Sequence, residues 1–302
     1  MTARAQIRWL DDARRLHLND GPIDLIVEAF GERDEVGAAY RAAATRFVRV
    51  LDELCTELVL LRQAKRINGP LPSGAIARRM VAAVSPYCEG TFITPMAAVA
   101  GAVAEEILLA MTAGARLSRA YVNNGGDIAL HLAPGQHFVV GMVERLDRPS
   151  LFGTATLDSE QPARGVATSG WRGRSFSLGI ADAVTVLADH AAMADAAATI
   201  IANAVDLPGH AGIVRLPAHS LAPDSDLGHR LVTQDVGKLS PAEIAAALEA
   251  GVAVAESLLA SGLIRSAALH LSGDTRAVGV EKLSMSGRPD SLQMPMWNCI
   301  QL

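Results

Sequence analysis

The sequence predicts a fold that mixes β-strands with α-helices, and three observations indicate it. The chain opens with short segments that end at turn residues such as Asn-Asp-Gly-Pro, the pattern of strands. Long alanine-rich segments follow, in which apolar residues recur three and four positions apart, the pattern of helices. The middle of the chain is again rich in short strand-like segments. We therefore expect helices packed on sheets.

Composition limits the class of protein. With 302 residues, 50% of them hydrophobic and 20% charged, the chain can build one large or two ordinary domains around a substantial core. We expect a single domain over residues 1–302, with an N-terminal β-hairpin region at 1–30 and an extended C-terminal tail at 283–302. The net charge of −5 lacks the basic excess of a nucleic-acid surface. No nucleic-acid partner is expected.

Cysteine usage and hydropathy predict the compartment. Cys55, Cys88 and Cys299 are widely spaced and odd in number, which fits neither a disulfide framework nor a metal knuckle. No apolar stretch of signal-peptide length is readable at the N-terminus. The longest apolar helical segments, 96–111 and 242–264, contain glutamates, so we expect packing helices and not membrane spans. These features predict a cytoplasmic protein without a membrane partner.

The elements are predicted in chain order from periodicity, turn residues and prolines. In the first third we expect strands at 6–9, 14–18 and 23–30, and helices at 34–65, 75–84 and 96–112. The strand-rich middle has candidates at 120–123, 127–132, 137–143, 152–157, 164–168 and 183–188. A helix at 190–205, a loop at 208–235, a helix at 241–263 and strands at 266–272 and 277–280 complete the prediction.

The most informative motif is the pair Asp195 and Thr199 in the predicted helix at 190–205. The i, i+4 spacing places a carboxylate and a hydroxyl on one face of a helix that is otherwise small and apolar. A carboxylate shielded from water must be paired or bind a cation, and oxygen ligands suit Mg²⁺ or Ca²⁺. The alternative is a helix edge at which Asp195 lies in solvent and Thr199 bonds back to a carbonyl.

A second motif is the run Asn123-Asn124-Gly125-Gly126-Asp127, which joins two short strands. Asn-Gly-Gly is typical of a tight hairpin turn. Alternatively, the glycines let a phosphate or a flat ring lie directly on backbone N–H groups.

A third motif is the strand end Ala167-Thr168-Ser169-Gly170, followed by two nearby arginines, Arg172 and Arg174. Its hydroxyls and amides can face a ligand whose anionic charge the arginines balance. The alternative is an ordinary strand exit with solvated arginines. Ser169 lacks the context of a nucleophile elbow, so a serine hydrolase is not supported.

Taken in order, these blocks and the strand at 183–186 before Ala194-Asp195-Ala196-Ala197-Ala198-Thr199 resemble the ApbE-like superfamily, the FAD:protein FMN transferases. The resemblance spans roughly residues 95–205. It implies a mixed α+β fold in which antiparallel or mixed sheets are packed by long alanine-rich helices. It also implies a bound FAD whose pyrophosphate lies near Mg²⁺. Family members transfer FMN from FAD to a hydroxyl of an acceptor protein and release AMP, and some split FAD.

The resemblance implies roles for individual residues. Asp195 and Thr199 would be the catalytic pair and the Mg²⁺ ligands. The residues that would bind the FAD nucleotide are Gly101, Asn124, Gly125, Gly126, Asp127, Thr168, Ser169 and Gly170.

The chain departs from the family pattern in three places. The family's lysine before the helix glycine is replaced at 99–102 by alanine, and residues 171–182 are too short for its His-x-x-Asp-Pro segment. The lipoprotein signal of exported members is not readable. The chain is thus identified as a member of the shorter, cytoplasmic, functionally unassigned branch, in which fold and metal pair persist.

Three functional hypotheses follow. The first is an Mg²⁺-dependent ApbE-like enzyme that acts on FAD or a related dinucleotide, with an acceptor protein as partner. The second is a flavin- or nucleotide-binding accessory protein that performs no transfer, and the third is a different small-molecule reaction on the same scaffold. A homodimer is a further expectation. A histidine-rich loop, with His210, His219 and His229, is either a metal site or, as its spacing favours, a solvated loop.

Overall fold

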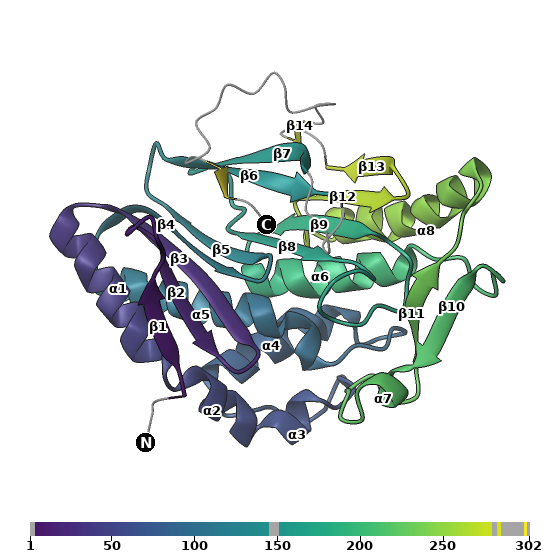
Figure 1. Cartoon of the computed structure of the whole chain (residues 1–302), viewed down its shortest axis with the longest axis horizontal. Helices are drawn as coiled ribbons and strands as arrows, with labels where there is room; N and C mark the ends of the chain where they lie inside the picture. The colour runs from purple at the N-terminus through teal and green to yellow at the C-terminus, as the bar shows by residue number, and fades with distance from the viewer. Residues whose placement is uncertain (1–3, 145–150, 280–282, 285–298, 301–302) are drawn as a thin grey trace. The chain divides into compact units, whose positions relative to one another are not determined.

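The computed structural model describes residues 4–144, 151–279, 283–284 and 299–300 (Figure 1). The chain divides into two compact units. The first comprises Met1–His137, Leu157–Val166 and Asp189–Asp195, and the second comprises Phe138–Thr156, Ala167–Ala188 and Ala196–Leu302. The single domain over residues 1–302 stays a prediction.

The first unit is built on antiparallel strands that are neighbours in chain order. They are β1 (Gln6–Trp9), β2 (Leu16–Asp20), β3 (Ile23–Gly31), β4 (Leu117–Asn124) and β5 (Asp127–Leu132). The first two residues of β8 (Gly165–Ser169) pair with β5. Alternate residues of β3, among them Leu25 and Val27, are fully buried. This period of two agrees with the strand predicted at 23–30, and the strand at 6–9 is also confirmed, whereas the strand predicted at 14–18 lies at Leu16–Asp20.

Helices cover this sheet on the face that carries those buried residues. They are α1 (Arg33–Phe47), α2 (Val50–Thr56), α3 (Leu58–Leu61), α4 (Ala75–Val84) and α5 (Val99–Ala113), with short 3₁₀ turns η1 (Ser85–Tyr87) and η2 (Pro95–Ala98). Helices α1 and α5 pack against each other, α1 also contacts β3, and α5 contacts β4 and β5. In Figure 1, α1 runs beside the purple strands β1–β3. The helix predicted at 75–84 is confirmed residue for residue.

The single helix predicted at 34–65 is wrong, because the chain turns near Val48 and again at Glu57 to form α1, α2 and α3. After the first turn Val50 is buried, whereas Leu51 is only partly buried. The sequence between residues 38 and 65 contains no Gly or Pro to signal these turns. They are set by packing and by Glu57, whose carboxylate accepts hydrogen bonds from the backbone N–H groups of Ser73 and Gly74.

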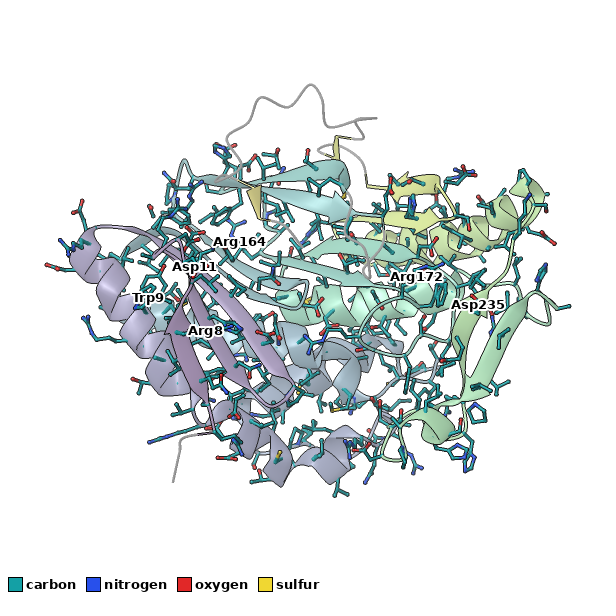
Figure 2. All side chains as sticks on the ribbon, viewed as in Figure 1. Arg8, Trp9, Asp11, Arg164, Arg172 and Asp235 are labelled. Atoms are coloured by element: carbon teal, nitrogen blue, oxygen red, sulfur yellow. The ribbon has the colours of Figure 1, made fainter. Side chains whose placement is uncertain are left out.

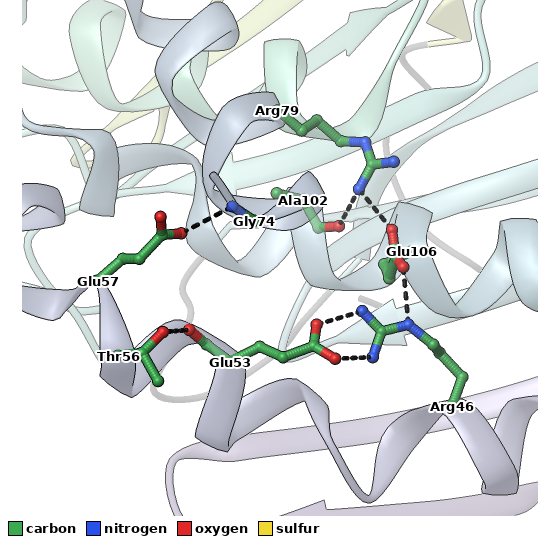
Figure 3. A network of polar contacts seen from close by, with 8 residues as sticks. All are labelled: Arg46, Glu53, Thr56, Glu57, Gly74, Arg79, Ala102 and Glu106. Atoms are coloured by element: carbon green, nitrogen blue, oxygen red, sulfur yellow. Dashed lines mark hydrogen bonds and ion pairs between the residues drawn. The ribbon is translucent and has the colours of Figure 1, made fainter. Parts of the chain in front are cut away.

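A network of charged side chains holds α5 in the first unit (Figure 3). Arg79 of α4 donates to the Ala102 carbonyl over 3.2 Å and pairs with Glu106 at 3.1 Å. Arg46 of α1 pairs with Glu106 at 2.7 Å and also binds both carboxylate oxygens of Glu53. Ion pairs from α1 and α4 therefore fix α5, and Glu53 of α2 holds the Arg46 guanidinium in place.

The segment Pro95–Ala113, which joins η2 and α5, is apolar enough by length and composition to cross a membrane. A core helix of a globular protein passes the same test. Within the described residues, this segment packs on helices and strands of the first unit and carries paired glutamates. Those contacts are the ones predicted for a packing helix, and the cytoplasmic location stays a prediction.

The second unit contains two further groups of strands. Strands β9 (Ala183–Ala188), β12 (Ser266–Leu271) and β13 (Asp274–Val278) are antiparallel neighbours, and α8 (Pro241–Ala260) packs on β12 and β13. A smaller, mixed sheet has the order β14-β7-β6-β15, formed by Leu283–Ser284, Leu151–Asp158, His137–Val143 and Cys299–Ile300. Helix α8 begins with a capping box between Ser240 and Glu243, with Pro241 at its first position.

Two predictions for this unit are wrong. The segment 208–235, predicted as a loop, forms β10 (Ile213–Pro217), α7 (Ala218–Leu221) and β11 (Leu231–Val236), because β10 and β11 pair as an antiparallel ribbon. The strand predicted at 277–280 begins earlier, at Asp274. Ser272 and Gly273 adopt φ values of 51° and 93°, which makes a two-residue hairpin turn between Leu271 and Asp274.

The mixed α+β fold class, with antiparallel and mixed sheets and alanine-rich helices, is confirmed. Of the C-terminal tail expected at 283–302, the structure describes 283–284 and 299–300, which form β14 and β15, and the rest lies outside the described residues.

Candidate functional site

The N-terminus of α5 binds the carboxylate of Asp195. Asp195 lies in α6 (Ala191–Ala204), and its Oδ2 accepts a hydrogen bond from the Gly101 backbone N–H over 3.0 Å. The N–H of Ala100 also hydrogen-bonds to this carboxylate. The acid therefore satisfies amides that the first turn of a helix leaves without intrahelical partners. The alternative in which Asp195 lies in solvent does not match this arrangement.

The environment of Asp195 disfavours its charge. Burial raises the pKa of this carboxyl to about 7, and the hydrogen bonds from Gly101 and Ala100 offset only part of the effect. The side chain keeps a partly exposed surface, but protein atoms surround most of it. Among the described residues, no basic side chain forms an ion pair with it. The ionised form of Asp195 therefore has no protein cation beside it, and a hard metal ion could balance its charge instead.

Thr199 lies one turn further along α6. A helical threonine commonly bonds back to a carbonyl, as Thr112 does to the Leu108 carbonyl over 3.0 Å. Within the described residues the Thr199 hydroxyl makes no such bond, and the residue is partly exposed. A carboxylate and a hydroxyl on one face of α6 thus both keep oxygen lone pairs for a further ligand.

Helices α5 and α6 cap each other's N-termini. Glu105 of α5 accepts the Ala192 N–H of α6 over 2.9 Å, and Arg79 pairs with the other oxygen of Glu105 at 2.9 Å. At the crossing, a Cβ on Gly101 would lie 2.3 Å from the Ala191 carbonyl oxygen. Sequence reasoning missed Glu105, although its position one turn after Gly101 on the same helix was a usable signal.

The asparagine–glycine motif lies at the β4–β5 hairpin, and Asn124 reaches the same helix start. Its Nδ2 donates to the Ala100 carbonyl over 3.1 Å. Gly125 and Gly126 have φ values of 66° and 114°, and the Gly126 N–H donates to Asn123 Oδ1 over 2.8 Å. Asn124 and Asp127 are opposite each other in the ladder. The tight-turn interpretation is therefore correct, and nucleotide contact by Gly125, Gly126 and Asp127 stays a prediction.

In the first unit, three residues predicted for the site meet at one point. The Gly101 N–H donates to the Asp195 carboxylate, as does the Ala100 N–H, and the Asn124 side chain donates to the Ala100 carbonyl. The contact between Gly101 and Asp195 joins residues 94 positions apart in sequence.

The Thr-Ser-Gly motif lies at the end of β8, in the second unit. The Thr168 and Thr185 hydroxyls are hydrogen-bonded across 2.9 Å, so a neighbouring strand side chain takes part of the bonding capacity of Thr168. Ser169 is partly exposed, and its hydroxyl makes no hydrogen bond within the described part of the chain. At Gly170, a Cβ would lie 2.4 Å from the Asp182 carbonyl oxygen. Close backbone packing thus explains Gly170, whereas Ser169 stays a predicted ligand contact.

Asp182 pairs at 2.9 Å with Arg172, which is labelled in Figure 2. Its second oxygen accepts the Ser272 N–H over 2.8 Å. The Arg172 guanidinium also lies over the Trp171 ring, 4.0 Å from its centroid. These contacts tie the segment after β8 to the β12–β13 turn, so Arg172 does not stand free to balance a ligand's charge.

The histidine-rich segment resolves into separate contacts. His210 bonds to Glu243 at 2.9 Å, whereas the rings of His219 and His229 lie together, with centroids 4.2 Å apart. Across the residues that the structure describes, no group of three or more His, Cys, Asp or Glu side chains is arranged to hold a metal.

The raised pKa of Asp195 predicts a pH-dependent stability. Because the folded pKa of about 7 exceeds the ordinary value of 3.8, the folded chain holds a proton that the unfolded chain releases first. Without metal, the free energy of unfolding should therefore fall as pH rises from about 4 to 7, by up to roughly 1.4 kcal/mol per pH unit. Urea unfolding at pH 5 and pH 7, in EDTA, measures it. In Asp195→Asn the fall should be smaller, and an identical pH dependence in both chains would contradict the prediction.

The fold and this pair of helix ends define an α+β protein with the motif blocks of the ApbE-like superfamily. The chain belongs to the family described as AbpE bacteria, whose model matches residues 7–277. This membership confirms the resemblance drawn from the motifs.

Curated relatives match about half of the chain. The UPF0280 protein MK0206 of Methanopyrus kandleri is 41% identical over 128 residues, which cover 42% of this chain and 48% of that protein. A UPF0280 protein of Methanothermobacter thermautotrophicus is 41% identical over 138 residues, 45% of this chain and 50% of the relative. The chain thus spans about half the length of these relatives.

Among solved structures, a variant of the flavin transferase ApbE from Vibrio cholerae is similar over 88% of this chain and 97% of its own. Its sequence identity is 12% and the TM-score is 0.37.

Proposed function

We propose that the protein is an Mg²⁺-dependent ApbE-like enzyme that acts on FAD or a related dinucleotide. The observation that carries the proposal is Asp195, a largely desolvated carboxylate without a basic partner among the described residues, one helical turn from the unbonded hydroxyl of Thr199. Family membership supports the same reaction class.

The residues present fit Mg²⁺. The ion prefers oxygen ligands and is often bound by one or two carboxylates together with substrate phosphates and water. Asp195 and Thr199 offer such oxygens from one rigid helix.

In this proposal the chain's own groups divide the work. When bound, Mg²⁺ would supply Lewis-acid stabilisation of charge on a pyrophosphate. The Gly101 and Ala100 N–H groups hold Asp195 in one orientation. Asn124, at the end of β4, holds the same backbone segment by donating to the Ala100 carbonyl. In the first unit, the backbone of the Gly125-Gly126 turn would contact the nucleotide.

The same step serves either acceptor. Cleavage of the FAD pyrophosphate transfers FMN to an acceptor-protein hydroxyl or to water, and AMP is released. The acceptor oxygen forms the new P–O bond, and its proton leaves to solvent or base.

A binding protein that performs no transfer is the second candidate. The segment 171–182 favours it, because here the family's His-x-x-Asp-Pro segment is replaced by a short connection. Arg172 and Asp182 of that connection are engaged with each other.

Calorimetric titration with FAD, with and without Mg²⁺, followed by chromatography for FMN and AMP, tests the proposal. We expect Mg²⁺-dependent FAD binding and the appearance of AMP. Binding without AMP release, even when an extract that supplies hydroxyl-bearing acceptor proteins is added, would overturn the enzyme proposal and favour the binding protein. No FAD binding would overturn both flavin proposals.

A further inference from the structure

Two histidines meet at the end of the β10–β11 ribbon in the second unit. His219 belongs to α7 and His229 lies just before β11, and their ring centroids are 4.2 Å apart with the rings tilted by 57°. The backbone fixes this approach, because the His219 N–H donates to the Gly228 carbonyl over 2.8 Å and the Ala218 N–H donates to the Arg230 carbonyl over 2.9 Å. The two imidazoles are therefore held together by local structure.

The contact of His219 defines its tautomer. Its Nδ1 lies 3.3 Å from the Gly228 carbonyl oxygen. A carbonyl oxygen only accepts, so Nδ1 carries the proton and Nε2 of the neutral ring keeps its lone pair. Metal-bound histidines typically donate their second ring N–H to a backbone carbonyl in this way. His219 is partly exposed and His229 exposed, so an ion can reach both rings from solvent.

We propose that His219 and His229 together bind one divalent transition-metal ion, for which Zn²⁺ is the probe. Imidazole nitrogen suits Zn²⁺ and its neighbours in the transition series, and disfavours Mg²⁺. In the proposed site each ring presents one nitrogen to the same ion, and water completes the coordination. In sequence, Asp224 and Asp226 lie between the two histidines. The site is independent of Asp195 and of the proposed function.

Zn²⁺ titration of the untagged full chain, monitored by calorimetry, tests the site. We expect one ion per chain in the wild type. Because loss of even an outer-shell partner typically weakens metal binding 10–100-fold, His219→Ala and His229→Ala should each weaken it by at least about tenfold. His137→Ala is the matched control, because His137 is an exposed histidine on β6 and its removal should leave Zn²⁺ binding unchanged.

A second measurement needs no variant. In the wild-type chain, Zn²⁺ should shift the imidazole NMR resonances of His219 and His229 and leave that of His137 in place. Equal Zn²⁺ affinity in the wild type and both variants, or no binding at all, would overturn the proposal. So would shifts confined to other histidines. None of these results would alter FAD binding or AMP release, so failure here is distinguishable from failure of the proposed function.

Discussion

Asp195→Ala should abolish Mg²⁺-dependent AMP release from FAD while leaving the chain folded. The substitution removes the carboxylate that the proposal assigns to the metal, and a single hydroxyl, Thr199, remains on that face of α6. Its loss should also remove the Mg²⁺-dependent part of FAD binding. Chromatographic AMP release at saturating Mg²⁺, with circular dichroism as the folding check, measures the effect.

The matched control is Asp274→Ala, because Asp274 is an exposed acid at the start of β13. That variant should keep full AMP release. Asp195→Asn separates charge from shape, since the amide oxygen can still accept the Gly101 N–H but carries no negative charge. AMP release by Asp195→Ala at the wild-type rate would exclude Asp195 as the metal ligand. If Asp195→Asn kept its activity while Asp195→Ala lost it, the negative charge of Asp195 would be excluded as the essential property.

Gly101→Ala should be strongly destabilising, by about 3 kcal/mol or more, since the added methyl group meets backbone atoms that cannot rotate away. A Cβ at this position would lie 2.3 Å from the Ala191 carbonyl oxygen and 2.7 Å from the Ala192 nitrogen. To relieve the overlap, α5 and α6 must separate, which also breaks the bonds of Asp195 to Gly101 and of Glu105 to Ala192. Urea unfolding measures the change.

Gly114→Ala provides the control at the other end of α5. Its φ of −126° suits any residue, and a Cβ there would have no neighbour within 4 Å. We expect its stability to change by no more than about 1 kcal/mol, with either sign. Similar unfolding midpoints for the two variants would show that the close approach at Gly101 is not a constraint. They would also weaken the case that this contact orients Asp195.

Local periodicity predicted much of the secondary structure. The bounds of α4, β5, β6 and β9 agree with the sequence prediction, because each element is delimited by its own turn residues, prolines or apolar runs. The prediction failed at the breaks between α1, α2 and α3, where the sequence carries no breaker. It also failed at the β10–β11 ribbon, whose Pro, Gly and His content is typical of a loop but whose backbones pair with each other.

The same division applies to the candidate site. Spacing alone placed Asp195 and Thr199 on one face of a helix, and the order of three motif blocks indicated the family to which the chain belongs. Both are properties of residues close in sequence or of blocks in a fixed order. The family resemblance also named Gly101 and Asn124 as candidates. It assigned them to nucleotide binding and did not predict that they lie close to each other.

Only the tertiary structure decided the partners of these residues. It bound Asp195 to Gly101, 94 residues away, and Glu105 to Ala192, 87 residues away, and it engaged Arg172 with Asp182. Helix and strand periods follow from backbone geometry and can be read within one segment. A carboxylate's partner and desolvation depend on which distant elements pack around it, and no local pattern contains that information.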